Sequence, residues 1–379
     1  MKVKVRTAVK AYVFIAMLNF IISLIAHGSI NKFLIVTAFL GIIYLIVTID
    51  IYEQIQKYNR SRKILSDDGT YIEAPEFRLL YYNLCGEFEK RLDALRKGYL
   101  SRIYLMVIPL VVSALISSSK IFGNDGYFKL LLFLFMFFIL AVLWNKAEAC
   151  KKQFRKIYKN EVLNKFVKAI HEGLEYNEFG ARERIEYIYR NSRLETICFD
   201  YLKVDDIISG QITEDTYVDL ANVCAIDERR TLNDKYKKRK VFEGLFSATK
   251  CTGDIKGNIK IKRQNKSVTA YEREQKVELD NQTFEKMYDV YCIDETFAYR
   301  ILTPDVMESL TELGKYGFDI EISIKDSVIY TRMALGPMFE PSFLNKALDR
   351  DSLYTYYCVI KFVVYLTESV NKSLETFVS

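Results

Sequence analysis

Histidine is nearly absent from this chain of 379 residues, which contains only His27 and His171. A Ser-His or Cys-His nucleophile pair would have to use His171, which lies at the end of a predicted helix without an oxyanion loop beside it. The sequence also lacks HExxH, GxGxxG, the glycine-lysine motif of a P-loop and an Asp/Asn calcium loop. These absences predict that the chain is not an enzyme and has no catalytic residue, cofactor or metal ligand.

Paired cysteines are missing as well. The seven cysteines are odd in number, widely spread and never arranged as CxxC, which is typical of reduced thiols and not of a disulfide framework or a zinc site. Carboxylates are plentiful, but we interpret Asp205-Asp206, beside Gly210, and Asp294-Glu295, at a predicted strand end, as turn residues. The carboxylates therefore predict no acid/base pair.

Charged residues are absent from three long segments, and one interrupts a fourth, all within the first 144 residues. A helix needs about 20 apolar residues to cross the hydrocarbon core of a bilayer. The pattern therefore predicts four transmembrane helices. They are Ala11–Asn31, Phe33–Ile49, Ile103–Ser119 and Tyr127–Trp144, the last of which contains Lys129.

Basic residues are scarce in the two short turns, which contain only Lys32 and Lys120. They are frequent before the first span and after the fourth, and ten of them lie between Lys57 and Arg102. Because basic residues are enriched in cytoplasmic loops, both termini and the long middle loop are predicted to be cytoplasmic.

Two charged helical segments flank the third and fourth spans. In both, apolar residues recur at three- and four-residue spacing, which predicts one apolar face on each helix. We expect the two helices to pair as an antiparallel stalk, because the faces are too narrow for two separate helices lying on a bilayer. The faces contain Leu80, Leu84, Phe88, Leu92 and Leu95 before the third span, and Cys150, Phe154, Ile157, Val162 and Phe166 after the fourth.

Beyond His171 the chain changes to short segments rich in β-branched and aromatic residues. Two alternating segments on either side of Lys325-Asp326-Ser327 predict a β-hairpin. The predicted fold class is a four-span α-helical transmembrane region with a helical stalk, followed by a cytoplasmic α+β domain rich in antiparallel strands. The predicted domains are a transmembrane hairpin at 1–51, cytoplasmic helical arms at 52–101, a second transmembrane hairpin at 102–144, the stalk at 145–192 and a sensor domain at 193–379.

The first two predicted spans carry polar residues on one helical face each. Such faces line conduits in some membrane proteins and hold helices together in others, and for a single Asn the second use is the commoner one. Asp50, at the end of the second span, could form an acidic ring in an oligomer. The candidate pore-lining residues are Asn19, Ser23, Thr37, Tyr44, Thr48 and Asp50.

A basic tract lies at Arg229–Lys266. It holds thirteen Lys/Arg against three Asp/Glu, a net charge of +10. Strand alternation in this tract places Ile259 and Ile261 on one face and Lys260 and Lys262 on the other, which predicts a positive stripe. The candidate ligand-binding residues are Lys237, Arg239, Lys260, Lys262 and Arg263.

Three interpretations of the basic tract remain open from the sequence. It could hold a nucleotide or oligonucleotide, with Tyr236 or Tyr271 available to stack on a base. It could contact anionic lipid headgroups. It could also be a solvated loop without a ligand.

Several short motifs occur together in an order that resembles a known family. They are YxxxDDIISGxI at Tyr201–Ile212, VFEGLF at Val241–Phe246, FxxxYxVY at Phe284–Tyr291, AYRILTP at Ala298–Pro304 and FEP at Phe339–Pro341. They resemble an uncharacterised family of bacterial membrane proteins with a domain of unknown function. The resemblance covers Glu76 to Pro341 and implies two transmembrane helices between a cytoplasmic coil and the domain, so the first two spans are an addition.

The predicted architecture is also similar to membrane effectors of nucleotidyltransferase-linked anti-phage systems of the Hailong type. This likeness implies an oligomeric effector in the bacterial inner membrane, in which a ligand-controlled channel or pore responds to a nucleotide or oligonucleotide made by a partner nucleotidyltransferase. The expected partners are therefore the lipid bilayer, further copies of the chain and that ligand. The alternative is a membrane-anchored interaction or scaffold protein that conducts nothing.

Overall fold

The computed structural model describes residues 74–109, 112, 126–192, 194, 198–230, 236–251, 257–264, 274–315, 317–341, 343 and 346–375. The chain divides into two compact units. The described residues between Lys97 and Lys152 belong to the first, here called the helical unit. Those in Gln54–Arg96 and Gln153–Ser379 belong to the second, the sheet unit.

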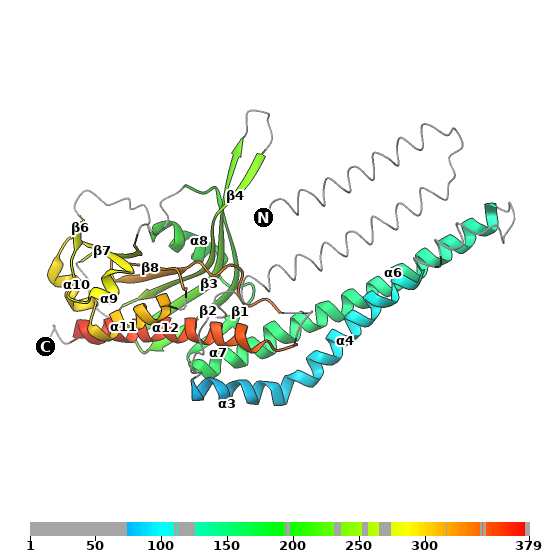
Figure 1. Cartoon of the computed structure of the whole chain (residues 1–379), viewed down its shortest axis with the longest axis horizontal. Helices are drawn as coiled ribbons and strands as arrows, with labels where there is room; N and C mark the ends of the chain where they lie inside the picture. Colours follow the sequence, from blue (N-terminus) through cyan, green and yellow to red (C-terminus); the bar gives the residue numbers. More distant parts are fainter. Residues whose placement is uncertain are drawn as a thin grey trace. The chain divides into compact units, whose positions relative to one another are not determined.

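Two long helices each contain a short π-helical segment (Figure 1). The first consists of α3 (Pro75–Leu84), η1 (Cys85–Glu89) and α4 (Lys90–Leu105). The second consists of α6 (Gly126–Ile157), η2 (Tyr158–Leu163) and α7 (Asn164–Ile170). Pro75 begins the first helix, where its missing N–H costs no hydrogen bond. The second ends at His171, whose backbone is extended.

No helix in the described ranges is both long and apolar enough to cross a membrane. This finding contradicts the predicted four-span region, and with it the channel and the multi-pass inner-membrane location. Tyr127–Trp144 forms the first part of α6. The same helix continues without a break into a charged sequence from Lys146 onward. The apolar composition of Tyr127–Trp144 therefore did not correspond to a separate membrane-spanning helix. Ala11–Asn31, Phe33–Ile49 and most of Ile103–Ser119 lie outside the described residues.

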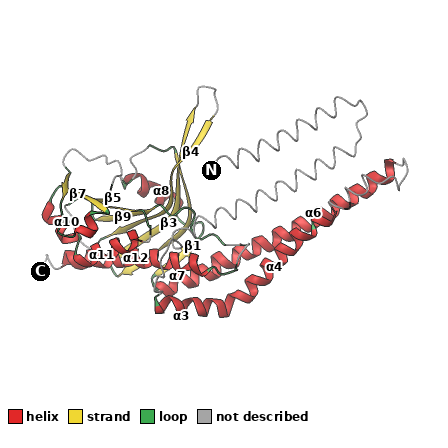
Figure 2. Ribbon diagram, in the orientation of Figure 1, coloured by secondary structure: helices red, strands yellow, loops and turns green. Residues whose placement is uncertain are grey.

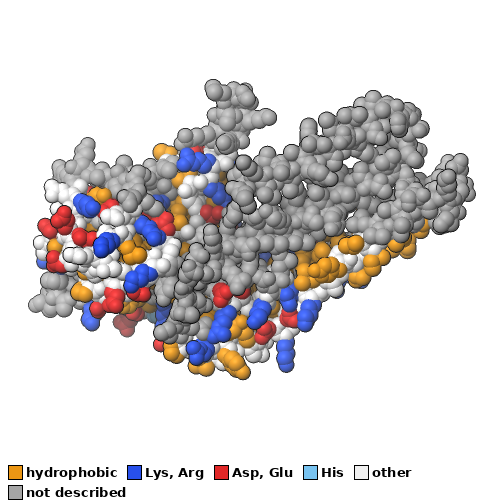
Figure 3. Space-filling model, in the orientation of Figure 1, with side chains coloured by type: hydrophobic (Ala, Val, Ile, Leu, Met, Phe, Trp, Pro, Cys, Tyr) orange, Lys and Arg blue, Asp and Glu red, His pale blue; other side chains and the backbone are white. Residues whose placement is uncertain are grey.

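Apolar side chains are distributed differently in the two units. In the helical unit, Leu131, Phe135 and Phe138 of α6 are exposed, and hydrophobic side chains are visible along the helices in Figure 3. In the sheet unit, Phe77 of α3 is buried and packs edge-on against Tyr354, with 4.9 Å between ring centroids. The sheet unit therefore has a conventional apolar core.

The sheet unit contains one sheet of nine strands in the order β1-β2-β3-β4-β9-β8-β5-β7-β6. All its strand pairs are antiparallel. The strands are β1 (Leu174–Asn177), β2 (Tyr201–Thr213), β3 (Thr216–Arg230), β4 (Tyr236–Lys250), β5 (Ile259–Arg263), β6 (Gln275–Val277), β7 (Tyr288–Cys292), β8 (Ile320–Lys325) and β9 (Val328–Met333).

The β8–β9 hairpin shows how local sequence sets strand register. Lys325 pairs with Val328, so Asp326 and Ser327 form a two-residue turn. Both have positive φ, 50° and 59°, as a type I′ turn requires. This turn places the alternating residues of both strands opposite one another.

Helices cover both faces of the sheet (Figure 2). On one face, Thr367 of α12 (Arg350–Glu375) lies 3.4 Å from the hydroxyl of Thr249 in β4. On the other, Tyr189 of α8 (Arg182–Asn191) packs against Phe246, with 4.9 Å between ring centroids. The remaining helices are α9 (Gln282–Glu285), α10 (Glu295–Ile301) and α11 (Pro304–Lys315). Strands of this sheet are therefore buried on two sides.

The two long helices lie side by side within the sheet unit. Arg91 forms an ion pair with Glu161 at 2.8 Å, and Lys165 forms one with Glu87. Most residues of the two predicted apolar faces are buried. Leu84, Phe88, Leu92, Phe154, Ile157, Val162 and Phe166 are buried, whereas Leu80, Leu95 and Cys150 are partly buried.

Candidate functional site

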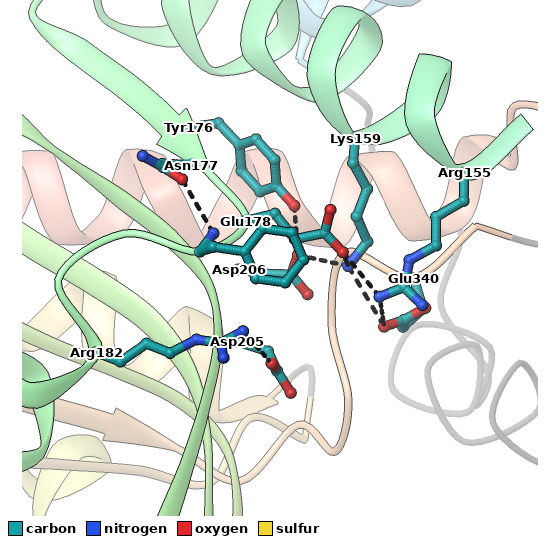
Figure 4. Close-up of polar contacts among 10 residues, drawn as sticks. Arg155, Lys159, Tyr176, Asn177, Glu178, Arg182, Asp205, Asp206 and Glu340 are labelled. Atoms are coloured by element: carbon teal, nitrogen blue, oxygen red, sulfur yellow. Dashed lines mark hydrogen bonds and ion pairs between the residues drawn. The ribbon is translucent and has the colours of Figure 1, made fainter. Parts of the chain in front are cut away.

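A group of charged residues with a buried centre joins the second long helix to the sheet (Figure 4). Its centre is Lys159 in η2, which is fully buried. The Lys159 Nζ donates a hydrogen bond to Asp206 Oδ1 at 2.6 Å. It also lies 3.5 Å from carboxylate oxygens of Glu178 and Glu340. One ammonium group thus binds three carboxylates from three separate parts of the sheet unit.

Two further residues complete this group, which we call the Lys159 cluster. Arg155 of α6 forms an ion pair with Glu178 at 2.9 Å and lies 3.8 Å from Glu340. Tyr176 of β1 donates its hydroxyl hydrogen to Asp206 Oδ1. The cluster consists of Arg155, Lys159, Tyr176, Glu178, Asp206 and Glu340, with two cations and three carboxylates.

Irregular backbone brings the central pair together. Asp206 has a φ of +55° and lies where the β2–β3 register shifts between Asp205 and Ile207. Such a bulge turns a side chain out of the regular alternation, and Asp tolerates positive φ better than most residues. Lys159 lies in a π-helical segment, which changes the direction of side chains relative to an α-helix. Backbone irregularities of these kinds are enriched at functional sites.

Burial dominates the electrostatics of the cluster. It raises the pKa of Asp206 to about 6, although the adjacent Lys159 ammonium and the Tyr176 hydroxyl act in the opposite direction. The Tyr176 pKa is raised far above its ordinary value, first by burial and then by the Asp206 charge. The Asp206 carboxyl therefore titrates closer to neutrality than an exposed Asp does.

The Lys159 cluster is not arranged to hold a metal ion. Across the part of the chain that the structure describes, no group of three or more His, Cys, Asp or Glu residues could do so. In the cluster itself, the Lys159 ammonium occupies the position between the carboxylates. The arrangement can hold elements together, and it can bind or release a proton.

The predicted basic stripe is divided by the fold. Lys260 and Lys262 are only 3% and 2% exposed, because β5 lies between β8 and β7 in a sheet that is covered on both faces. Burial lowers the pKa of Lys262 to about 8, with the Lys260 charge as the second cause. Arg263 Nη1 donates to the Phe318 carbonyl at 3.4 Å. Strand alternation correctly separated the lysines from the isoleucines, but it did not show that the lysine face is buried.

The other part of the basic tract is exposed. β3 and β4 extend beyond their neighbouring strands as a two-stranded ribbon, which we call the basic ribbon, residues 227–230 and 236–240. Lys238, Arg239 and Lys240 are exposed there. Lys238 forms an ion pair with Glu228 at 2.6 Å, and Arg239 is opposite Asp227 in the register.

Several other predicted residues have local structural roles or lie outside the described part. Lys237 pairs through its backbone with Arg229, and its side chain is not described. Asp294 caps α10 by accepting a hydrogen bond from Thr296 N at 3.0 Å. The His171 Nδ1 accepts one from Gly173 N at 3.2 Å. The pore-lining candidates Asn19, Ser23, Thr37, Tyr44, Thr48 and Asp50 all lie outside the described residues.

Sequence reasoning missed the Lys159 cluster. Asp206 was interpreted as a turn residue, but it is buried in the middle of β2. Lys159 is one of many lysines in a charged helix, so nothing in its local sequence marks it as buried. Two of the motifs that carry the family resemblance include residues of the cluster: the motif at Tyr201–Ile212 contains Asp206, and FEP at Phe339–Pro341 contains Glu340.

The comparisons with known proteins locate one family match. A family model described as "Protein of unknown function (DUF3137)" matches residues 240–372, which agrees with the expected resemblance to an uncharacterised domain. No curated protein matches the chain. The solved structure of the mycobacterial trehalose monomycolate transport factor A, TtfA, is similar with a TM-score of 0.32 and 9% identity, over 55% of this chain and 97% of that chain. A likeness of this size carries no argument about this chain.

Proposed function

We propose that the sheet unit is a non-catalytic sensing module that binds a phosphate-bearing ligand, a nucleotide or a short oligonucleotide, at the basic ribbon. The observation that carries this proposal is the exposure of Lys238, Arg239 and Lys240 on strands that extend past their neighbours. Arginine binds phosphate oxygens through two parallel N–H groups, and lysine adds a mobile point charge.

The existing ion pairs of the ribbon do not prevent such binding. Lys238 remains 65% exposed while paired with Glu228, and water and salt screen exposed pairs of this kind so that they contribute little to stability. A ligand with several phosphates can therefore replace these carboxylates at small cost. By contrast, Lys260 and Lys262 are buried and do not contribute to a surface that such a ligand could reach.

The Lys159 cluster supports the second part of the proposal, which concerns an effect on the long helices. It connects η2, which is continuous with α6, to β1, β2 and the segment before α12. Ligand binding on the sheet can thus change how this helix is held. From the Hailong-type likeness we propose that the chain acts as an oligomeric effector in bacterial anti-phage defence, with a ligand supplied by a nucleotidyltransferase.

The alternative is an interaction or scaffold protein without a small ligand. The observation in its favour is that Lys238 and Arg239 already have acidic neighbours in the ribbon, which are Glu228 and Asp227. Such a surface can also recognise another protein by charge complementarity. Binding of phosphate compounds to the purified chain separates the two functions.

The test is a binding titration of the full chain with a panel of nucleotides and short oligonucleotides, and with inorganic phosphate alone. We expect affinity to fall steeply with salt, since phosphate contacts release counterions. Lys238→Glu combined with Arg239→Glu should weaken binding at least tenfold. The control is Lys165→Glu, together with Arg91→Glu, which makes the same charge change at exposed positions away from the ribbon.

Each outcome decides between the alternatives. Equal affinity of parent and ribbon variant would contradict the proposed site, and equal loss in both double variants would indicate non-specific charge attraction. Vesicles of anionic lipid form a second arm of the titration, because headgroup phosphates have the same chemistry. If vesicles bind and nucleotides do not, the nucleotide-sensing function is wrong.

A further inference from the structure

The Lys159 cluster has one carboxylate too many for its cations. We infer that it is a proton-controlled latch, in which one proton held by Asp206 fastens η2 to the sheet and loss of that proton loosens the attachment. This inference is independent of any ligand at the basic ribbon, because it depends only on residues inside the cluster.

Charge balance is the first argument. Arg155 and Lys159 face Glu178, Asp206 and Glu340, so the fully ionised cluster has a net charge of −1. Uncompensated charge is costly away from water. One bound proton makes the cluster neutral, with the two cations matched to the two remaining carboxylates.

Burial identifies Asp206 as the carboxylate that takes the proton. Its side chain is 0% exposed, whereas those of Glu178 and Glu340 are 16% and 31% exposed. Lys159 and Tyr176 both donate to Asp206 Oδ1, whereas Oδ2 is buried and accepts no hydrogen bond from the residues that the structure describes. The Glu178 and Glu340 side chains, in contrast, are partly exposed to solvent.

The tyrosines and the arginine around Asp206 do not change their charge near neutral pH. Burial is the main cause that raises the pKa values of the tyrosines Tyr158, Tyr176 and Tyr356, so all three stay neutral. Arg155 has a raised pKa, to which Glu340 and Glu178 contribute, and stays charged. The charged and titratable groups around Asp206 are Arg155, Tyr158, Lys159, Tyr176, Glu178, Glu340 and Tyr356, and Asp349 acts on Tyr158 and Tyr356.

The direction of the pH effect follows from the raised Asp206 pKa. Its ordinary value is 3.8 and its value in the folded chain is about 6. The attachment is therefore strongest below the ordinary value and weakens as the pH rises through the folded value. Above that pH, three ionised carboxylates face the Lys159 ammonium and the Arg155 guanidinium. Repulsion among the carboxylates then loosens the contact between η2 and the sheet.

The size of the effect can be derived from the same two values. Between pH 5 and pH 8, the proton linkage of a group with pKa values of 3.8 and about 6 changes the opening equilibrium about tenfold. This change is large enough to be seen by hydrogen exchange, and it is specific to the elements that the cluster joins.

The test is hydrogen exchange of the full chain at pH 5 to 8, with each rate divided by the intrinsic rate at that pH. Peptides covering η2, β1 and the middle of β2 should lose about tenfold protection as the pH rises. In Asp206→Asn, which is isosteric and cannot titrate, protection of these peptides should stay high and independent of pH. Glu340→Gln removes one negative charge, so that the cluster is neutral without a bound proton. In this variant the pH dependence of hydrogen-exchange protection should also be smaller.

The matched control is Asp205→Asn. Asp205 is the exposed neighbour of Asp206 and pairs with Arg182 at 3.2 Å outside the cluster. Its replacement should leave the pH response unchanged. The latch is excluded if Asp206→Asn and Glu340→Gln both keep the parent response, or if Asp205→Asn removes it. Because none of these residues is in the basic ribbon, nucleotide titration of the same variants separates failure of the latch from failure of the proposed function.

Discussion

Two lysines of the sheet unit form ion pairs of the same length in opposite surroundings. Lys238 of the basic ribbon lies 2.6 Å from Glu228, with side chains 65% and 28% exposed. Lys159 lies 2.6 Å from Asp206, with both side chains 0% exposed. Distance alone therefore does not distinguish an exposed ion pair from one that lies in the interior of the fold.

The difference lies in the solvent. Around the ribbon pair, water screens the attraction and competes for both partners, so the pair contributes little. Around the buried pair, each charge has already lost its water, and the attraction mainly offsets that loss. Such a pair is sensitive to removal of one partner and to protonation, whereas the ribbon pair responds mainly to salt and to other anions.

The largest expected effect comes from breaking the buried pair. Lys159→Met keeps the length of the side chain but leaves Asp206, Glu178 and Glu340 without the shared ammonium. We expect it to lower the free energy of unfolding at pH 8 by about 3–5 kcal/mol. Urea unfolding followed by circular dichroism measures this change.

The matched ribbon change should be small. Lys238→Met removes the same group from a pair of the same length, and we expect almost no change in the free energy of unfolding, because water screens both charges. If both variants lose the same free energy of unfolding, burial is not what distinguishes the two pairs.

An intermediate effect is expected from Lys262, which is buried next to another cation. Its pKa in the folded chain is about 8, below the ordinary 10.5, so the folded state binds that proton less tightly than the unfolded state. The free energy of unfolding should therefore rise by about 1–2 kcal/mol between pH 7 and 9.5. In Lys262→Met this rise should be absent, and a variant that keeps it would assign the rise to other groups.

A smaller effect than that of Lys262→Met should come from Tyr176→Phe. It removes the hydroxyl that donates to Asp206 Oδ1, but the Lys159 ammonium continues to donate to the same oxygen. We expect a loss of about 1 kcal/mol. The pH midpoint of the hydrogen-exchange response should move upward, since the Tyr176 hydrogen bond lowers the Asp206 pKa. A downward shift would show that Tyr176 stabilises the protonated form.

Local sequence patterns predicted many elements of the sheet unit. Apolar spacing from Leu80 to Leu95 predicted a helix, where the chain forms α3, η1 and α4 between Pro75 and Leu105. Alternation and turn residues predicted the β8–β9 hairpin. These signals are short-range, because they depend on residues a few positions apart. The same kind of signal predicted membrane spans, and there the described helices contradict it.

The surroundings of individual side chains depend on residues that are far apart in the chain. Sequence alone determined that Lys260 and Lys262 share one face of a strand, because side chains alternate along any strand. Only the tertiary structure decided that this face is buried, since burial depends on which strands and helices pack around it. In the same way, residues 159, 206 and 340 meet through packing, and the loss of water at their meeting point makes Asp206 a proton-binding group.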